Sequence, residues 1–165
     1  MNEPAPCVIY DSMLGGLAKS LRAAGYSAVF ESHIDDAELV RLAFEQDLCL
    51  LTSDAGILDR YAVSQNLVRC VFVPLGLSKT EQLAHVMSKL DLKLRESRCM
   101  RCNGVLEEVA LADVRERIPP KVLANCRRFY RCDGCGKVYW RGTHWESIRA
   151  RLRRAEALAR LESPE

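Results

Sequence analysis

The sequence lacks several features that define large classes of protein. No apolar stretch is long enough to cross a bilayer, so no membrane-spanning helix and no membrane partner are expected. Residues 1–6 contain no cationic segment leading into an apolar run, so we expect no secretory signal and a cytoplasmic location. No Gly-x-Gly-x-x-Gly follows the first predicted strand, and Gly-Lys-Ser/Thr is absent. A dinucleotide site or a P-loop nucleotide site is therefore not expected.

Two Cys-x-x-Cys pairs are present, Cys99/Cys102 and Cys132/Cys135. Four thiolates arranged in this way can surround one tetrahedral Zn²⁺, with nearby glycines allowing the tight turns. The 29 residues between the pairs exceed the usual spacing, so we expect a zinc ribbon that carries an insertion. Two disulfides, or plain buried thiols, are the alternative. A reducing cytosol favours metal binding over cross-linking.

Charge is distributed unevenly along the 165 residues, a length that allows one domain plus a small module. Residues 1–94 carry 8 Lys and Arg against 12 Asp and Glu, whereas residues 95–165 carry 16 against 10. An acidic front half and a basic back half suit a polyanion that one part binds and the other cuts. A solvated basic helix within 149–160 would explain much of the same excess.

The first 94 residues alternate short apolar runs with segments of helical spacing. Parallel strands joined by right-handed helical crossovers produce this pattern. Ser78 and Glu81 form a predicted capping box for the last of these helices. The four predicted strands lie within 7–10, 28–30, 48–52 and 68–73. We therefore expect an α/β domain with a parallel sheet of about four strands.

Carboxylates follow the predicted strands. Asp11 comes after the first strand, Asp54 after the third, and Asp36 begins the helix between them. Groups beyond the carboxyl ends of neighbouring parallel strands meet at one crevice. Converging carboxylates repel one another unless they hold a cation, and oxygen ligands suit Mg²⁺ or Mn²⁺. Such an ion would support metal-dependent phosphodiester hydrolysis, with Asp59 as a weaker fourth candidate. Each acid alone could instead be a helix N-cap.

Several segments resemble the Mut-seven C-terminal family, a PIN-like ribonuclease domain followed by a zinc ribbon. The resemblance covers roughly residues 7–147. It is carried by residues 11–26, by 51–60, by Arg98-Cys-Met-Arg-Cys-Asn103, by Ile118-Pro-Pro120 and by 129–144. It implies a three-layer PIN-like fold and metal-dependent cleavage of RNA.

The resemblance also implies roles for individual acids. Asp11 matches the first metal-binding carboxylate, Asp36 the carboxylate on a helix, and Asp54 the acid of a Thr-x-Asp motif. Related short PIN domains often have another acid two residues later, where this sequence has Gly56. The fourth carboxylate is therefore absent or displaced to Asp59, so the number of catalytic metal ions is left open.

Basic and aromatic residues are candidates for RNA binding. Basic groups hold phosphates while aromatic rings stack on unpaired bases. The candidates near the crevice are Lys19, Arg22 and Arg60, and those in the ribbon are Arg101, Arg128, Arg131, Lys137, Tyr139, Trp140, Arg141 and His144. The ribbon aromatics could equally form its own small core. Tyr139 and Trp140 cannot both point inward from one strand.

We predict three parts: a PIN-like nuclease domain over 1–94, a zinc ribbon over 95–147 and a C-terminal helix over 148–165. The pattern of Glu146–Leu161 is amphipathic, so this helix packs back on the first domain or binds a protein partner. The leading function is an RNase that uses Mg²⁺ or Mn²⁺ and holds RNA with its ribbon. A non-catalytic RNA-binding or interaction adaptor with a degenerate pocket is the main alternative. A toxin or a small-substrate phosphatase fits less well. The oligomeric state is not predicted.

Overall fold

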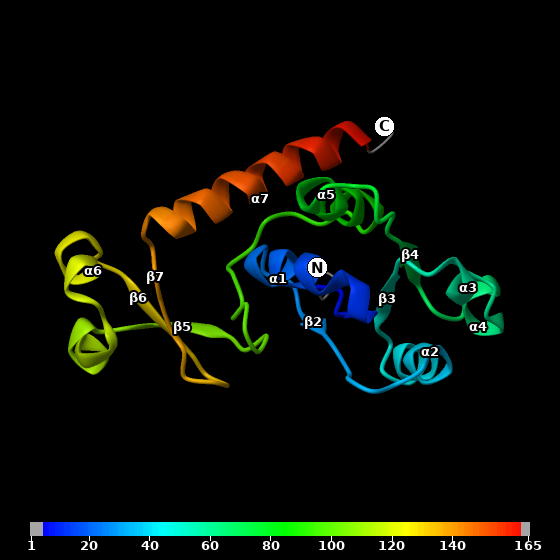
Figure 1. Ribbon diagram of the computed structural model, residues 1–165, viewed down its shortest axis with the longest axis horizontal. Coiled ribbons are helices and arrows are strands. Elements are labelled where there is room, and N and C mark those ends of the chain that lie inside the picture. The colour runs from blue at the N-terminus through cyan, green and yellow to red at the C-terminus, as the bar shows by residue number, and fades with distance from the viewer. Residues whose placement is uncertain (1–4, 163–165) are drawn as a thin grey trace.

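A four-stranded parallel sheet forms the centre of the first half of the chain (Figure 1). The computed structural model describes residues 5–162, so the outer ends of the predicted segments 1–94 and 148–165 lie outside it. The strands are ordered β2 (Ala28–Val29), β1 (Val8–Tyr10), β3 (Cys49–Thr52), β4 (Cys70–Phe72). Every neighbouring pair is parallel, which confirms the predicted α/β class.

Helices cover both faces of this sheet, giving three layers. The face that carries Val8 and Tyr10 packs against the buried side of α1 (Gly15–Ala23) and α5 (Lys79–Lys89). The opposite face, which carries Ile9 and Leu50, packs against three other helices. These are α2 (Asp36–Glu45), α3 (Ala55–Leu58) and α4 (Tyr61–Ser64). A strand buried on both faces needs apolar residues at every position, as the runs in β1 and β3 show.

The C-terminal helix α7 (Thr143–Glu162) lies across α5 and joins the first half of the chain (Figure 1). Ile148, Leu152, Ala155 and Ala159 are buried in the same cluster as α1 and α5. The helix therefore packs back on the α/β part of the chain, and its apolar face is not available to a protein partner. It begins at Thr143, before the predicted start at 148, because the β7 strand leads into it through one short turn.

The second half of the chain forms a three-stranded antiparallel sheet. Its strands are β5 (Leu106–Val109), β6 (Phe129–Cys132) and β7 (Val138–Trp140), in that order. The expected insertion contains two 3₁₀ turns, η2 (Leu111–Asp113) and η3 (Arg115–Arg117), and helix α6 (Pro120–Asn125). It closes a small core over one face of the sheet, made of Val114, Ile118, Cys126, Phe129 and Val138. The insertion thus supplies the apolar cover that a short ribbon lacks.

The segment between the two halves is held against α1. Ser97 Oγ donates to the carbonyl of Ala23 at 2.6 Å, and the Arg98 N–H donates to the carbonyl of Arg22 at 2.8 Å. The Arg22 guanidinium donates to the carbonyl of Ala28 at 2.6 and 3.0 Å and to that of Met100 at 3.2 Å. Arg22, expected to meet RNA phosphates, is thus occupied with fastening the two halves together.

None of the helices within residues 5–162 combines the length and the apolar character needed to span a membrane.

We expect Gly25→Ala to destabilise the protein by more than about 1 kcal/mol, because Gly25 has φ = +100° and sits against the linker. A Cβ there would lie 2.6 Å from Arg95 Cβ and 2.7 Å from the Glu96 carbonyl oxygen. The control is Gly15→Ala, which meets no atom within 4 Å in a helical conformation. Urea unfolding would measure both. Equal stability of the two variants would contradict the proposed packing.

Candidate functional site

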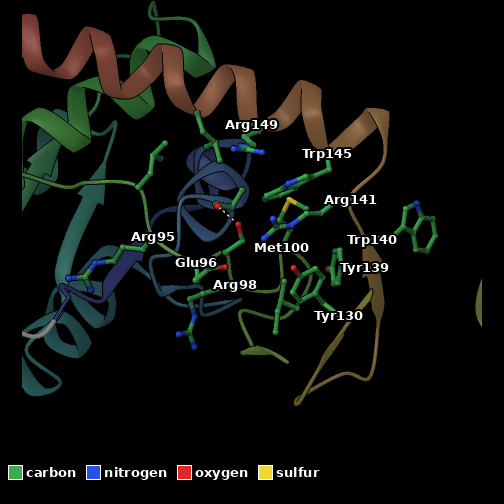
Figure 2. A pocket seen from close by; sticks show the side chains of 15 residues that line it. Arg95, Glu96, Arg98, Met100, Tyr130, Tyr139, Trp140, Arg141, Trp145 and Arg149 are labelled. Atoms are coloured by element: carbon green, nitrogen blue, oxygen red, sulfur yellow. Dashed lines mark hydrogen bonds between the residues drawn. The ribbon is translucent and has the colours of Figure 1, made fainter. Parts of the chain in front are cut away.

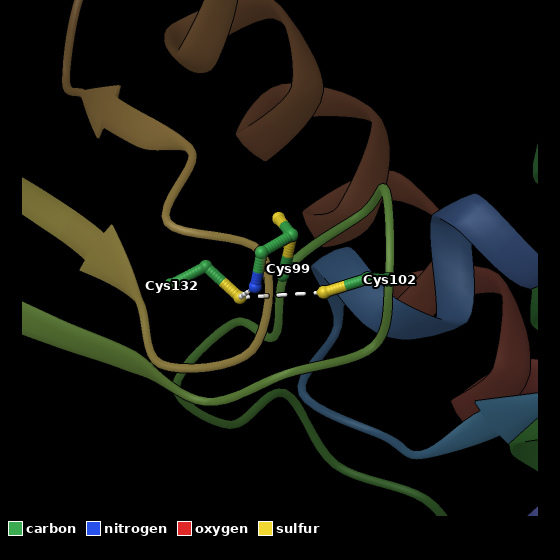
Figure 3. Close-up of side chains that lie close together, drawn as sticks. Cys99, Cys102 and Cys132 are labelled. Atoms are coloured by element: carbon green, nitrogen blue, oxygen red, sulfur yellow. Dashed lines mark hydrogen bonds between the residues drawn. The ribbon is translucent and has the colours of Figure 1, made fainter.

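The four cysteines of the two Cys-x-x-Cys pairs come together at one point. Figure 3 shows three of them, Cys99, Cys102 and Cys132, on their loops. Their sulfur atoms all lie within 4.8 Å of one another. Cys99 and Cys135 Sγ are 3.7 Å apart, and Cys102 and Cys132 Sγ are 3.4 Å apart. A disulfide needs about 2.0 Å, whereas the corners of a tetrahedron of thiolates about 2.3 Å from Zn²⁺ are separated by about 3.8 Å. The donor set and its dimensions therefore fit a closed structural zinc site.

The surroundings favour an ionised Cys99 but a protonated Cys132 when no cation is bound. The Tyr139 hydroxyl lies 3.1 Å from Cys99 Sγ, and the Cys135 N–H points to Cys132 Sγ at 3.5 Å. Burial acts to raise the pKa of Cys99, but bonds from Tyr139 and from backbone N–H groups outweigh it and lower that pKa to about 6. Burial raises the pKa of Cys132 to about 12 in the absence of a cation. Gly104 lets the two loops meet, because a Cβ there would lie 2.5 Å from Cys132 Sγ.

Three of the cysteines outside this cluster, Cys49, Cys70 and Cys126, are poorly placed to be reactive centres. Burial raises the pKa of Cys49 to about 12 and that of Cys70 to about 11. A thiol that stays protonated at neutral pH is a poor nucleophile. Cys126 is buried in the core of the ribbon.

Asp11 and Asp54 are linked through one buried threonine. Thr52, at the end of β3, is fully buried, and its hydroxyl donates to Asp11 Oδ2 at 2.7 Å. The same hydroxyl oxygen accepts from the Asp54 N–H at 3.0 Å. The Ser53 N–H donates to Asp11 Oδ2 at 2.9 Å and the Met13 N–H to Asp11 Oδ1 at 2.9 Å. The Asp11 carboxylate is therefore held in one orientation at the carboxyl end of the sheet.

Asp54 caps the helix that follows it, whereas Asp36 does not. Asp54 Oδ1 accepts from the Gly56 N–H at 2.7 Å and so caps α3. Asp36 does not cap α2, because the preceding Asp35 does so by accepting from the Glu38 N–H at 2.9 Å. The half-exposed Asp36 carboxylate instead faces Arg60 Nη2 at 3.8 Å. Arg60, predicted to meet phosphate, thus connects the end of α3 to the start of α2.

The predicted acids are not drawn into a tight metal cage. Within the described part of the chain, the four cysteines are the one group of three or more metal-ligand side chains close enough to hold an ion. Asp11, Asp36 and Asp54 therefore share the carboxyl edge of the sheet without converging as the cysteines do. Asp59 is exposed at the C-terminal end of α3, five residues after Asp54.

A cationic cleft runs along α1 away from this edge. Its cavity of about 270 Å³ lies between α1, α5, α7 and the loop at Met100. Two predicted RNA-binding residues, Lys19 and His144, line it from opposite ends of the sequence. Lys79 and Arg151 line it as well. Neither had been singled out from the sequence, because only the packing of α7 on α5 brings them next to Lys19.

The other predicted RNA-binding residues of the ribbon differ in whether they are paired with an acid, packed on the core or exposed. Arg128 donates two hydrogen bonds to the Glu108 carboxylate, at 2.7 and 2.9 Å, and this contact lowers the pKa of Glu108. Trp140 packs on the ribbon core, whereas Tyr139 faces the other side of β7. Arg128 also lies over the Tyr130 ring, 5.8 Å from its centroid. The remaining candidates Arg101, Arg131, Lys137 and Arg141 are exposed, with Lys137 over the Tyr139 ring and Arg141 over the Tyr130 ring.

We expect one zinc ion per chain. Cys132→Ser should lower the bound zinc well below one ion per chain, because a closed site needs all four thiolates. Cys7→Ser is the matched control, since Cys7 lies outside the cluster and contacts Ser27 Oγ at 3.1 Å. Metal content by mass spectrometry would check both. A zinc-free wild-type chain with intact near-ultraviolet circular dichroism would contradict the assignment.

Comparison with protein families gives a match that covers both halves of the chain. The profile described as the Mut7-C RNAse domain matches residues 6–152. Comparison with curated proteins found no match, and comparison with solved structures found none either. The match includes Asp11, Asp36, Asp54 and all four clustered cysteines. The chain therefore belongs to the Mut7-C RNAse domain family.

Proposed function

We propose that the protein is a divalent-metal-dependent ribonuclease that hydrolyses RNA phosphodiester bonds at the carboxyl edge of its parallel sheet. The zinc ribbon assists by binding RNA. The family match supports ribonuclease activity. The observation that assigns the activity to this edge is the pair of hydrogen bonds made by the Thr52 hydroxyl. One buried hydroxyl bonds both to the Asp11 carboxylate and to the Asp54 backbone, so the two acids keep a defined relation across neighbouring strands.

The residues that would hold Mg²⁺ or Mn²⁺ are Asp11, Asp36 and Asp54. Their carboxylate oxygens suit a hard cation, which when bound lowers the pKa of a water and neutralises charge on the phosphodiester. The Asp11 carboxylate accepts three hydrogen bonds that hold it in place. The Asp36 carboxylate does not cap α2, because Asp35 does. Asp54 caps α3 with Oδ1, which leaves Oδ2 outside the cap. Since they do not form a tight cage, we propose that metal binding is weak until RNA phosphate adds its own oxygens.

Neighbouring side chains would position these acids. Ser53 Oγ donates to the carbonyl of Val73 at 2.8 Å, which ties the end of β3 to the segment after β4. Arg60 holds Asp36 near the end of α3 and is half-exposed. We propose that Arg60 exchanges this weak contact for an RNA phosphate, because an exposed ion pair contributes little stability.

The cationic cleft provides a path for RNA between this edge and the ribbon. Gly16 and Lys79 lie at the end of the cleft nearest Asp11, and Met100 lies at the end next to the metal-binding loops. Lys79 occupies the first turn of α5. A cation there is repelled by the positive end of the helix dipole, at a cost of about 0.3–1 kcal/mol. A phosphate bound there would offset that cost, and Lys19 and Arg151 add to the positive potential.

We place this activity in the cytoplasm. Eight cysteines are unpaired with one another, and four of them form a site whose thiolates must stay reduced to bind metal. A reducing compartment keeps such a site intact.

A non-catalytic RNA-binding adaptor is the second candidate. It is favoured by the commitment of Asp54 Oδ1 to the Gly56 N–H and by the absence of a carboxylate at position 56. In this case RNA would occupy the ribbon and cleft without turnover.

Asp54→Asn should reduce RNA cleavage in Mn²⁺ or Mg²⁺ by at least about 100-fold, because a metal-binding oxygen is lost. Asparagine is as good an N-cap as aspartate, so folding and zinc content should not change. The control is Asp47→Asn, at an exposed position with φ = +52° that asparagine accepts. Cleavage of a labelled single-stranded RNA is measured. Wild-type turnover by the Asp54 variant rejects this active site, and RNA binding without any wild-type turnover favours the adaptor.

Lys79→Gln should weaken RNA binding and lower the slope of log affinity against log salt by about 0.7, the loss of one phosphate contact on a single strand. Lys89→Gln removes the same charge from the exposed far end of α5 and should leave the slope unchanged. RNA affinity is measured by fluorescence anisotropy at salt concentrations from about 50 to 200 mM, where the salt dependence of such binding is large. Equal slopes for the two variants would exclude the cleft as the RNA path.

A further inference from the structure

A second cavity, of about 340 Å³, lies where the ribbon sheet, the linker and α7 meet (Figure 2). It opens beside the cationic cleft, with which it shares Ala23, Met100 and Leu152 as lining residues. The linker contributes residues 94–98, and α7 contributes Trp145, Arg149 and Leu152. No part of the acidic edge of the parallel sheet lines it.

Aromatic rings form two of its walls. Tyr130 of β6 and Tyr139 of β7 are direct cross-strand partners, so their side chains stand together on one face of the ribbon sheet. This is the face that the inserted helix α6 does not cover, because Phe129 and Val138 point the other way into the small core. Figure 2 shows Trp145 on α7 across the cavity from the two tyrosines, with Met100 between them. Trp140 also lines the cavity, although its ring lies apart from the two tyrosines in this view.

Two buried polar atoms of these walls have no partner. The Tyr130 hydroxyl oxygen and the Trp145 indole nitrogen are the buried side-chain atoms without a hydrogen bond in the described residues. Leaving such a group unsatisfied costs about 1–3 kcal/mol. Both belong to side chains that line this one cavity. Both atoms are covered by their neighbours, so a ligand that offers a hydrogen-bonding edge as well as an apolar face would remove that cost after a shift of the lining side chains.

Cations at the cavity are of two kinds. Arg95 and Arg98 are occupied elsewhere, Arg95 over the Tyr26 ring at 5.6 Å and Arg98 with the Asn103 carbonyl at 2.8 Å. The Arg141 guanidinium lies over the Tyr130 ring, 5.4 Å from its centroid. Arg149 is exposed, projects beside Trp145 in Figure 2, and forms no ion pair within the described chain. Arg149 is therefore available for a phosphate at the mouth.

We propose that this cavity binds one unpaired nucleobase of the RNA strand. The base would lie among the planar groups of Trp145, Tyr130 and Arg141, and Arg149 would hold its phosphate. Aromatic and guanidinium planes are the surfaces on which proteins stack splayed bases. The proposal rests on the proposed function in that the ligand is RNA, but it requires no catalysis.

The position of the cavity suits a strand that continues into the cleft. The shared residues Met100 and Ala23 separate the two spaces, so a base in one leaves its phosphodiester chain at the entrance of the other. Lys19, Lys79 and Arg151 then follow along α1 toward Asp11. The ribbon would thereby hold one nucleotide at a set distance from the bond to be cut.

The direct test uses Trp145 as a reporter of stacking. The chain contains two tryptophans, and Trp140→Phe leaves Trp145 as the single one. This protein, with bound zinc and no Mg²⁺ or Mn²⁺, is titrated with hexa-adenylate and with an abasic hexamer of equal charge. Hexa-adenylate should quench the fluorescence and bind at least about tenfold more tightly than the abasic hexamer, because stacking of a base contributes about 1–3 kcal/mol. Equal affinity and no quenching would overturn the proposal.

Variants of the lining separate the cavity from general charge. Tyr130→Phe keeps the ring and removes one hydroxyl, so we expect about fivefold weaker binding of hexa-adenylate, the loss of one hydrogen bond, with unchanged zinc content. Arg149→Ala should weaken binding and lower the salt slope by about 0.7. Arg153→Ala, also exposed on α7 but outside the cavity lining, removes the same charge and is the control. Equal effects of the two arginine variants would contradict the proposal.

A failure here can be told from a failure of the proposed nuclease. Asp54→Asn should retain quenching by hexa-adenylate, since Asp54 is outside the cavity. Cleavage by the wild type with no quenching would reject the base site and keep the ribonuclease. Quenching with no cleavage by the wild type would keep the base site and reject the ribonuclease. A response to an acidic hexapeptide but not to hexa-adenylate would assign the cavity to a peptide instead.

Discussion

Four sulfur atoms within 4.8 Å of one another constrain the rest of this structure. Such a group is stable when a cation compensates the thiolates, because several buried anions at that spacing repel. The cluster joins two loops that are 29 residues apart and presents Asn103 to the α/β part of the chain. Asn103 bonds to the Ala28 N–H and to Ser27, at the edge strand of the parallel sheet. The metal-binding loop therefore covers that edge and sets the position of the ribbon.

Docking of the ribbon aligns three chemically different surfaces. Carboxylates lie at the ends of β1 and β3, cations follow along α1, and aromatic rings stand on the uncovered face of β6 and β7. The long helix α7 completes both cavities, since its buried side packs on α5 while Trp145 and Arg151 reach the ribbon side and the cleft. In the ribonuclease that we propose, the acidic site by itself would repel RNA, and the adjoining cations would supply the attraction.

Much of this could be predicted from local patterns. Alternating strands and helices indicated the parallel sheet, and Ser78 with Glu81 forms the capping box that their spacing predicted. Other residues were harder to assign, because neighbours in sequence share the same local preference. Asp35 rather than Asp36 caps α2, and Arg22 binds backbone carbonyls at the junction although it was expected to meet RNA. Which of two adjacent acids caps, or which arginine is occupied, depends on partners far along the chain.

The amino-acid sequence by itself determined the four thiolates, the α/β order, the acids that follow the strands and the amphipathic last helix. Each of these follows from spacing within a short segment, where side-chain periodicity and turn geometry act. The tertiary structure decided that α7 packs on α5, that Lys79 and Arg151 share a cleft with Lys19, and that Tyr130 faces Trp145. These pairings join residues that no local pattern relates, so they arise only when the burial of apolar faces brings distant segments together.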